Sequence, residues 1–384
     1  MATVATMLVL CLGAGPVAAA PGEPDVTAGG AVLWDPADDR ALFDKQAGAA
    51  RPMASTTKIM TVLLALEAGA GDETLSVSAE AAAVDDAPGT ATLGLQPGQQ
   101  LPVDSVLEGL LLRSGNDAAV AVAEHVSGSE PAFVARMNAR AVELGLDATS
   151  FVNASGLTND LAHHASPTDL ARLAEVAMRD DDFRAWVNSM SSTVPGIGTL
   201  VNRNELLDRY RGADGVKTGY TALAGLCLVA SATRDGRRLF SVVLDSQASF
   251  SDAAALLDYG FNAFRRVQPL QRRVRVTRYH WAGADVALLS DGVLGRTLPT
   301  GAAVRLRTIL RPDARRPLRS GHVLGRAELL TGGRVVDRVA LRAARSVPAS
   351  PPAASPAAGA TTVGRAVQDA LRAFARLRPV TREL

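Results

Sequence analysis

The fold of this chain is decided by one seven-residue stretch, Ala54-Ser55-Thr56-Thr57-Lys58-Ile59-Met60. An apolar run follows up to residue 66, and its spacing predicts a buried helix rather than a strand. Positions i and i+3 share a helix face, so we expect the Ser55 hydroxyl and the Lys58 amine to touch. A lysine whose pKa is lowered by burial or by a second cation can take the proton of a serine nucleophile. Alone, the pattern is also typical of an ordinary helix start.

Lysine is rare in this chain, which makes Lys58 informative. Only three of the 40 basic residues are lysines, namely Lys45, Lys58 and Lys217, and the other 37 are arginines. Arginine keeps its proton at any useful pH, so it can serve wherever only a positive charge is needed. We therefore interpret Lys58 and Lys217 as positions that require a titratable or compact ammonium group.

A second motif is Ser114-Gly115-Asn116, which stands between two apolar segments with helical spacing. The first segment covers residues 103–112 and the second begins at Asp117. Glycine and asparagine at such a junction are also typical of simple helix punctuation, because glycine ends one helix and asparagine caps the next.

The third motif is Lys217-Thr218-Gly219, followed by Tyr220. Two apolar runs, residues 226–232 and 239–244, come next and are joined by an Asp-Gly turn, which predicts a β-hairpin. We expect Lys217 on a neighbouring strand of the same antiparallel sheet, where Gly219 lets a substrate backbone approach closely. In isolation, a lysine on an edge strand is the more ordinary interpretation. Cys227 lies in an apolar run and is interpreted as a small buried side chain, not a nucleophile.

Together, the three motifs in this order resemble the low-molecular-weight penicillin-binding proteins, specifically the serine D-alanyl-D-alanine carboxypeptidases. The segments 137–153 and 214–225 also look like family segments, and the resemblance covers roughly residues 28–265. It implies an α/β transpeptidase fold of the penicillin-binding/β-lactamase type, with an antiparallel sheet and a helical subdomain. A small all-β domain often follows in this family.

The resemblance implies catalytic roles for four residues. Ser55 would attack the carbonyl carbon of the penultimate D-alanine, and Lys58 would take its proton. Ser114 would relay a proton toward the leaving amine, and Asn116 would position Lys58 and the substrate amide. The implied substrate is the peptidoglycan stem peptide, and β-lactam antibiotics are the implied covalent inhibitors. Neither a metal nor a cofactor is expected.

The resemblance also implies a substrate-binding strand. Lys217 and Thr218 would hold the terminal carboxylate of the substrate beside Gly219, and Lys217 would help to lower the pKa of the catalytic lysine. The backbone N–H groups of Ser55 and Tyr220 would form the oxyanion hole, as fixed dipoles aimed at the developing charge.

Three functions stay open at this point. The first is a DD-carboxypeptidase, the second a DD-endopeptidase or β-lactamase on the same fold, and the third a non-catalytic wall-binding protein. A β-lactamase would need a deacylating glutamate after the Ser-x-Asn motif. Glu143 is the nearest candidate, but its surroundings depart from the expected motif at Asp147. A silent protein would be expected to carry a broken motif, and none is broken.

The charge of the chain changes sign near residue 265. Residues 1–264 carry a net charge of −15, residues 265–345 carry +13 and residues 346–384 carry +3. We predict a catalytic domain over 25–265 and a basic all-β domain over 270–345, where valine and leucine alternate with arginine. The positive charge indicates an anionic surface nearby, either a cell-wall polymer or lipid headgroups, although a solvated arginine-rich surface fits equally well. Nucleic acid is not expected, because aromatics for base stacking are sparse.

Both ends of the chain carry segments outside these domains. Residues 1–20 are mostly apolar or small and end in Ala18-Ala19-Ala20, so they predict a signal peptide and an extracytoplasmic protein, although no basic residue precedes Arg40. A Pro/Ala-rich linker over 346–361 leads to a stretch over 362–379 with apolar residues on one side and flanking arginines. That pattern predicts an interfacial amphipathic helix and peripheral membrane contact. Docking onto another protein is the alternative.

Overall fold

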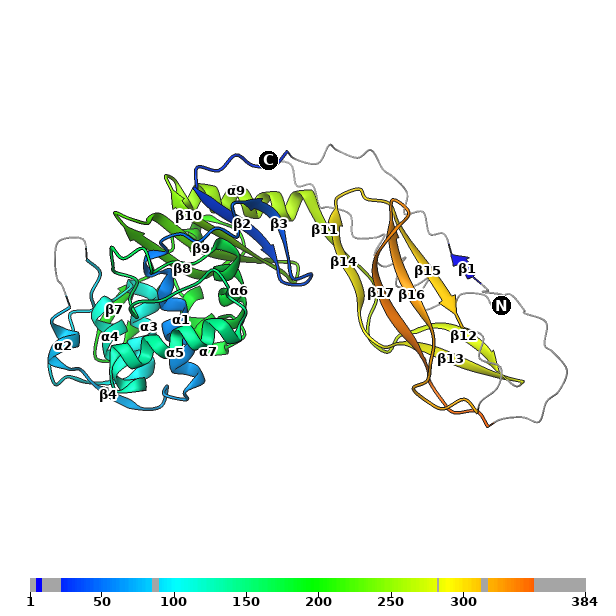
Figure 1. The fold of residues 1–384 in the computed structure, drawn as a ribbon, viewed down its shortest axis with the longest axis horizontal. Helices are drawn as coiled ribbons and strands as arrows, with labels where there is room; N and C mark the ends of the chain where they lie inside the picture. Colours follow the sequence, from blue (N-terminus) through cyan, green and yellow to red (C-terminus); the bar gives the residue numbers. More distant parts are fainter. Residues whose placement is uncertain (1–4, 9–21, 85–89, 282, 312–316, 349–384) are drawn as a thin grey trace. The chain divides into compact units, whose positions relative to one another are not determined.

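The computed structural model describes residues 5–8, 22–84, 90–281, 283–311 and 317–348 of the chain (Figure 1). The chain divides into two compact units, one of Pro21–Phe261 and one of Asn262–Leu384 together with Met1–Ala20. The division falls inside helix α9 (Ser249–Ala263). The domain limits inferred from the sequence, 25–265 and 270–345, remain predictions.

The first unit is built on a five-stranded antiparallel sheet with the strand order β3-β2-β10-β9-β8. Its strands are β2 (Gly30–Asp35), β3 (Arg40–Lys45), β8 (Ala213–Thr221), β9 (Gly225–Arg234) and β10 (Arg237–Ser246). β9 and β10 form the hairpin expected from the sequence. Its turn residues Asp235 and Gly236 have φ angles of 51° and 75°, as a two-residue turn that matches strand twist requires. β8 lies beside this hairpin at the edge of the sheet, so Lys217 lies on the strand where it was expected.

Helices cover both faces of this sheet (Figure 1). On one face α9 packs closely, because Gly260 faces Leu33 and Leu239 with no room for a side chain. On the other face α1 (Lys58–Glu67) is buried from Lys58 through Ala65. It contacts four helices, namely α3 (Val103–Arg113), α4 (Asn116–Ser127), α5 (Glu130–Glu143) and α6 (Pro167–Ala177). The helical layer also contains α2 (Ala79–Ala82), α7 (Asp181–Asn188) and α8 (Leu206–Arg209).

Two helix starts follow from local capping. At the start of α5, the Ser129 side chain accepts a hydrogen bond from the Ala132 N–H, and at the start of α6 the Ser166 side chain accepts one from the Asp169 N–H. A proline lies in the first turn of each helix. Short two-stranded sheets complete the unit. They pair β4 (Thr74–Ser76) with β5 (Gln100–Pro102) and β6 (Ser191–Val194) with β7 (Gly198–Val201).

The second unit is all-β among its described residues, which confirms the fold class expected for this part of the chain. A six-stranded sheet has the order β1-β15-β16-β17-β13-β12, and a two-stranded sheet pairs β11 with β14. The strands are β1 (Ala5–Leu8), β11 (Phe264–Leu270), β12 (Arg275–Trp281), β13 (Ala284–Ser290), β14 (Leu294–Pro299), β15 (Val304–Leu310), β16 (Val323–Thr331) and β17 (Arg334–Ala343). Side chains from both sheets share one apolar core, which includes Val267, Leu294, Leu306 and Leu341.

Most of the two end segments lies outside the described residues. Of the predicted signal peptide, only β1 is described, and it pairs antiparallel with β15. Of the predicted linker, Val347 still pairs with Leu318 of the second unit. The predicted amphipathic helix over 362–379 lies entirely outside the described residues. No helix within the described part of the chain is both long and apolar enough to cross a membrane.

Candidate active site

Ser55 lies on a short 3-10 helix, η1 (Ala54–Thr57), and α1 begins only at Lys58. The chain enters this turn sharply, because Ala54 has a φ of 48°. The turn still brings the two side chains together, with the Lys58 Nζ atom 2.9 Å from the Ser55 Oγ atom. Ser55 and Lys58 therefore touch as expected, on a tighter turn than the α-helix inferred from the sequence.

The Lys58 amine is fully buried and contacts three oxygen atoms. Besides Ser55 Oγ, these are Asn116 Oδ1 at 2.7 Å and the backbone carbonyl oxygen of Ser155 at 2.6 Å. Burial, and after it the positive charge of Lys217, lower the pKa of Lys58 well below its usual value, while Asp117 opposes the shift. The site therefore favours a neutral amine next to the serine hydroxyl.

Asn116 reaches Lys58 from the junction of two helices, and Ser114 lies at the same junction without a hydrogen bond from its hydroxyl to Ser55 or Lys58. Ser114 ends α3 in the left-handed region with a φ of 72°, Asn116 begins α4, and both side chains are buried. A Cβ atom on Gly115 would lie 2.6 Å from Leu93 Cγ, so a glycine is needed where the 91–95 segment crosses. The junction therefore ends one helix and begins the next, and it also places the Asn116 amide oxygen against Lys58.

The buried carboxylate of Asp117 holds the 91–95 segment against this junction through hydrogen bonds. Asp117 accepts the backbone N–H groups of Leu93 at 2.9 Å and Leu95 at 3.1 Å. The N–H of Asn116 donates in turn to the carbonyl of Ala91 at 2.7 Å. These bonds fix the backbone that presents the Asn116 side chain to Lys58.

The third motif, Lys217-Thr218-Gly219, lies on β8, the edge strand of the sheet. Lys217 is buried, and its Nζ atom donates to the carbonyl of Thr218 at 3.1 Å. Burial and the nearby Arg203 guanidinium lower the pKa of Lys217 to about 7. Thr218 is half-buried, while the Tyr220 side chain is 66% exposed.

Gly219 brings β8 against the nucleophile's own backbone. A Cβ atom at this position would lie 3.0 Å from the Ser55 nitrogen and 3.2 Å from the Thr56 nitrogen. A side chain here would therefore press on the N–H group that lies beside the Ser55 hydroxyl.

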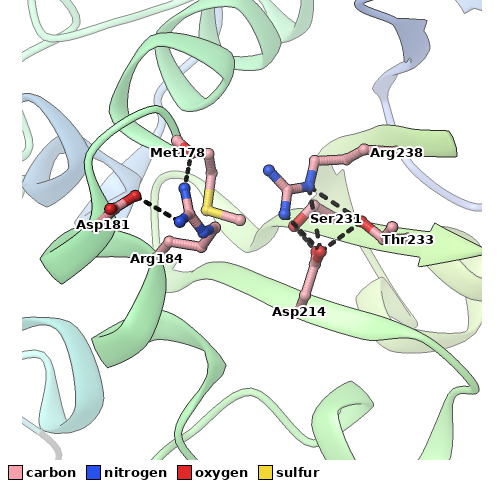
Figure 2. Close-up of polar contacts among 7 residues, drawn as sticks. All are labelled: Met178, Asp181, Arg184, Asp214, Ser231, Thr233 and Arg238. Carbon is pink, nitrogen blue, oxygen red and sulfur yellow. Dashed lines mark hydrogen bonds and ion pairs between the residues drawn. The ribbon is translucent and has the colours of Figure 1, made fainter. Parts of the chain in front are cut away.

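A carboxylate anchors the start of β8 to the rest of the sheet (Figure 2). Asp214 accepts the hydroxyl protons of Ser231 and Thr233, each at 2.6 Å, and the Arg238 guanidinium donates to it at 2.9 Å. These partners belong to β9 and β10. The strand that carries Lys217 is therefore fixed by two side chains of its neighbour β9 and by one side chain of β10, the next strand in the sheet.

The sequence interpretation missed Ser155 and Arg203, and it noted Gly156 only as part of a segment that resembles the family. Gly156 has a φ of +81°, and a Cβ atom there would lie 2.0 Å from the Ala54 carbonyl oxygen, so this loop packs directly on the turn that holds Ser55. The residues 151–157 carry only the signals of a loop. A backbone carbonyl such as that of Ser155 leaves no residue signature, whereas Arg203 was hidden among many arginines.

His163 was also missed, and it supports the turn that carries the nucleophile. The Val152 N–H donates to His163 Nδ1 at 3.0 Å, so the ring proton is on Nε2, which donates to Thr57 Oγ1 at 2.7 Å. Thr57 Oγ1 then donates to the Ala54 carbonyl at 2.8 Å. These three hydrogen bonds have a consistent donor and acceptor at each step, and the last one ends at Ala54, next to Ser55.

Burial lowers the pKa of His163 to about 4, with smaller contributions from His164 and Lys58. The folded-state pKa is below the unfolded value of about 6.5, so the unfolded chain binds more protons in between. The contribution of His163 to the free energy of unfolding is therefore complete above about pH 6.5, and it is lost as the pH falls toward about 4.

We expect the stability advantage of the wild type over His163→Phe to shrink by about 2 kcal/mol between about pH 7 and pH 4.5. Urea unfolding at several pH values measures it. A pH-independent difference for His163→Phe would show that the ring is not held neutral by this hydrogen-bond chain.

Two other side chains considered from the sequence lie away from this chemistry. Glu143 is exposed and pairs with Arg140 at 2.8 Å on the surface of α5. Burial raises the pKa of Cys227 to about 12, in keeping with a small buried side chain. Within the described ranges, no group of His, Cys, Asp and Glu side chains could hold a metal ion.

Comparison with known proteins connects this geometry to a family. A family model described as D-alanyl-D-alanine carboxypeptidase matches residues 17–248. The chain is 36% identical over 251 residues to D-alanyl-D-alanine carboxypeptidase DacF of Bacillus subtilis, covering 63% of this chain and 64% of DacF. It is 32% identical over 347 residues to D-alanyl-D-alanine carboxypeptidase DacA of Escherichia coli, covering 85% of each.

Solved structures agree with these relatives. Penicillin binding protein 5 from Haemophilus influenzae has a TM-score of 0.73 at 29% identity, covering 86% of this chain and 100% of that chain. The Streptomyces K15 DD-transpeptidase has a TM-score of 0.60 at 32% identity, covering 63% of this chain and 99% of that chain. The chain therefore belongs to the D-alanyl-D-alanine carboxypeptidase family of penicillin-binding hydrolases.

Proposed function

We propose that this protein removes the terminal D-alanine from peptidoglycan pentapeptide stems through an acyl-enzyme on Ser55, and that penicillins acylate the same serine. The observation that carries this proposal is the set of three oxygen atoms around the buried Lys58 amine.

A neutral amine has two N–H groups and one lone pair. Asn116 Oδ1 and the Ser155 carbonyl can only accept, so they take the two N–H groups of Lys58. The lone pair is then left to face Ser55 Oγ, 2.9 Å away, and can accept the hydroxyl proton. This arrangement makes Lys58 the general base and fixes its orientation without any carboxylate.

The reaction then proceeds in two stages. Ser55 Oγ bonds to the carbonyl carbon of the penultimate D-alanine while its proton passes to Lys58, and the oxyanion forms beside the N–H groups of Ser55 and Tyr220. The C–N bond to the terminal D-alanine breaks as Ser114 relays a proton to the leaving nitrogen. Water then cleaves the ester on Ser55 and completes the cycle.

A cluster of cations suits the terminal carboxylate of the substrate. Burial first, and then repulsion from Arg203, lower the pKa of Lys217, and the charges of both residues also lower the pKa of Lys58. A bound carboxylate would raise the pKa of Lys217 again and keep it charged. The hydroxyl of Thr218 is the neutral donor at this position on the strand. We propose Lys217, Thr218 and Arg203 as the carboxylate pocket, with Gly219 keeping β8 close to Ser55.

We expect Lys217→Arg to lower kcat/KM at least tenfold, or about 1.4 kcal/mol of transition-state binding. The wide guanidinium fork cannot occupy the buried position of a compact ammonium group without displacing its neighbours. Steady-state assay of D-alanine release measures the effect. An unchanged Lys217→Arg enzyme would show that this lysine has no part in carboxylate binding.

Particular residues distinguish the proposed carboxypeptidase from the alternative functions. Glu143, the glutamate considered for the β-lactamase alternative, is exposed and paired with Arg140, so it does not support that alternative. A non-catalytic wall-binding protein would have no use for a fully buried lysine held against a serine hydroxyl. A DD-endopeptidase would use the same groups and stays a second candidate. We also propose that the protein is exported to the cell envelope, where the proposed substrate lies.

The test is an assay of the purified protein on two substrates, a soluble pentapeptide ending in D-Ala-D-Ala and a cross-linked stem-peptide dimer. We expect D-alanine to be released from the pentapeptide, with slower or no cleavage of the dimer. Cleavage of the dimer alone would replace the carboxypeptidase with an endopeptidase, and inactivity on both would refute the proposed function.

A further inference from the structure

One face of the six-stranded sheet in the second unit gathers arginines from four strands. Strand register places them, because residues directly opposite each other on neighbouring strands point to the same face. Arg307 on β15 lies opposite Glu328 on β16, which lies opposite Arg338 on β17. Arg342 lies opposite Leu289 on β13, which lies opposite Arg275 on β12.

The two rows belong to the same face. Arg338 and Arg342 are four residues apart on β17, and side chains alternate with a period of two along a strand. The same alternation adds Arg305 and Arg326, which lie two residues from Arg307 and Glu328. Arg278 joins them because, after a register shift in β12, it lies opposite Ala287, two residues from Leu289 on β13. We call the whole set the arginine face, and its members are Arg275, Arg278, Arg305, Arg307, Arg326, Arg338 and Arg342.

The opposite face of the sheet is the apolar core. Leu306, Ala327, Val339 and Leu341 alternate with the arginines of their strands and are buried. Residues of β11 and β14 pack into that core as well. On the arginine face, in contrast, Arg275, Arg278, Arg305 and Arg338 are exposed.

Acidic side chains balance only part of the positive charge. Glu328 is buried between Arg307 and Arg326, with both contacts at 2.6 Å. Asp291 lies 2.8 Å from Arg342, and Asp285 lies 4.0 Å from Arg278. Seven arginines and three carboxylates leave a surplus of four positive charges. Arg275, Arg305 and Arg338 have no carboxylate within ion-pair distance among the described residues.

The chemistry of this face fits phosphate groups carried on a chain. Guanidinium groups donate two parallel hydrogen bonds to a phosphate, and here a rigid sheet spaces them at about 5 to 10 Å across neighbouring strands. Insertion into a bilayer needs exposed apolar anchors, but the large exposed apolar side chains of this unit, among its described residues, are only Val293, Val323 and Val335. Tyr279 and Trp281 instead pack against the core, so they are not presented for stacking on bases.

We propose that the arginine face binds a linear anionic polymer with a phosphate in each repeat. Several phosphates contact the sheet at once, so binding is strongly dependent on salt. This inference concerns a surface in the second unit and does not depend on the catalytic assignment of Ser55.

The experiment measures binding of the full-length protein to fluorescently labelled long-chain inorganic polyphosphate. We expect saturable binding that weakens at least tenfold between about 50 and 200 mM NaCl. The variant Arg275→Glu/Arg305→Glu/Arg338→Glu is expected to bind at least tenfold more weakly than the wild type, while its release of D-alanine from a soluble pentapeptide stays unchanged. The milder triple substitution to Gln serves if the Glu variant does not fold.

A control with the same charge change decides whether the face itself matters. Arg272, Arg319 and Arg334 are exposed arginines of the same unit at turns or strand ends. Arg334 lies opposite Thr331, beyond a register shift in the β16–β17 pair, so it is not part of the arginine face. Their triple substitution to Glu is expected to weaken binding less than threefold. Equal losses in both triple variants would overturn the proposal in favour of net charge alone. Binding to anionic phospholipid vesicles but not to polyphosphate would overturn it in favour of a membrane surface.

Discussion

Ser55→Ala is expected to abolish D-alanine release and covalent labelling by a fluorescent penicillin, with a loss of at least about a thousandfold in kcat. The hydroxyl is the only group removed, and in the wild type it contacts the Lys58 amine. Lys58 keeps its two other partners, Asn116 and Ser155, so the fold should survive. The loss then reports the missing nucleophile.

The matched control is Ser191→Ala, an exposed serine on β6. It is expected to keep wild-type activity and labelling. Thermal unfolding of Ser55→Ala within a few degrees of the wild type would confirm that the site remains intact. Undiminished penicillin labelling of the Ser55→Ala variant would remove this serine from the mechanism.

Lys58→Arg is expected to lower the rate of acylation by penicillin at least about a thousandfold. A guanidinium cannot give up its proton at useful pH, so it cannot accept one from Ser55. For the wild type, acylation should rise with pH as Lys58 loses its proton, and because the pKa of Lys58 is lowered this rise should be complete well below pH 10.5. The Arg variant should show no such rise.

The chain's own Lys45 provides the control for this substitution. Its Nζ atom donates to the Val26 carbonyl at 2.6 Å, in contact with none of the site residues described above. Lys45→Arg is therefore expected to acylate within about twofold of the wild type. Acylation of Lys58→Arg within tenfold of the wild-type rate would assign the base to another group.

The sequence predicts those features that depend on residues close together along the chain. The contact between Ser55 and Lys58 follows from a spacing of three residues on one turn, although the turn is a 3-10 helix. Lys217 was placed on the correct strand because the Asp235-Gly236 turn fixes the hairpin beside it. The rarity of lysine in the composition was enough to single out both buried cations.

The parts that escaped prediction depend on contacts between distant segments. Ser155 accepts from Lys58 through a backbone carbonyl, and the two residues are 97 positions apart. Gly156 is required because its loop packs onto Ala54, a contact that only the folded chain creates. His163 looks like any other histidine until Val152 and Thr57 are seen at its two ring nitrogens.

The central claim is that Ser55 carries the acyl group, and mass spectrometry of the penicillin-treated protein tests it most directly. Trypsin should release residues 46–58 as one peptide, because Pro52 protects the bond after Arg51. We expect the penicilloyl adduct on this peptide, and fragmentation should place it on Ser55 rather than on Thr56 or Thr57. An adduct on any other residue, or an intact mass unchanged by penicillin, would contradict the account.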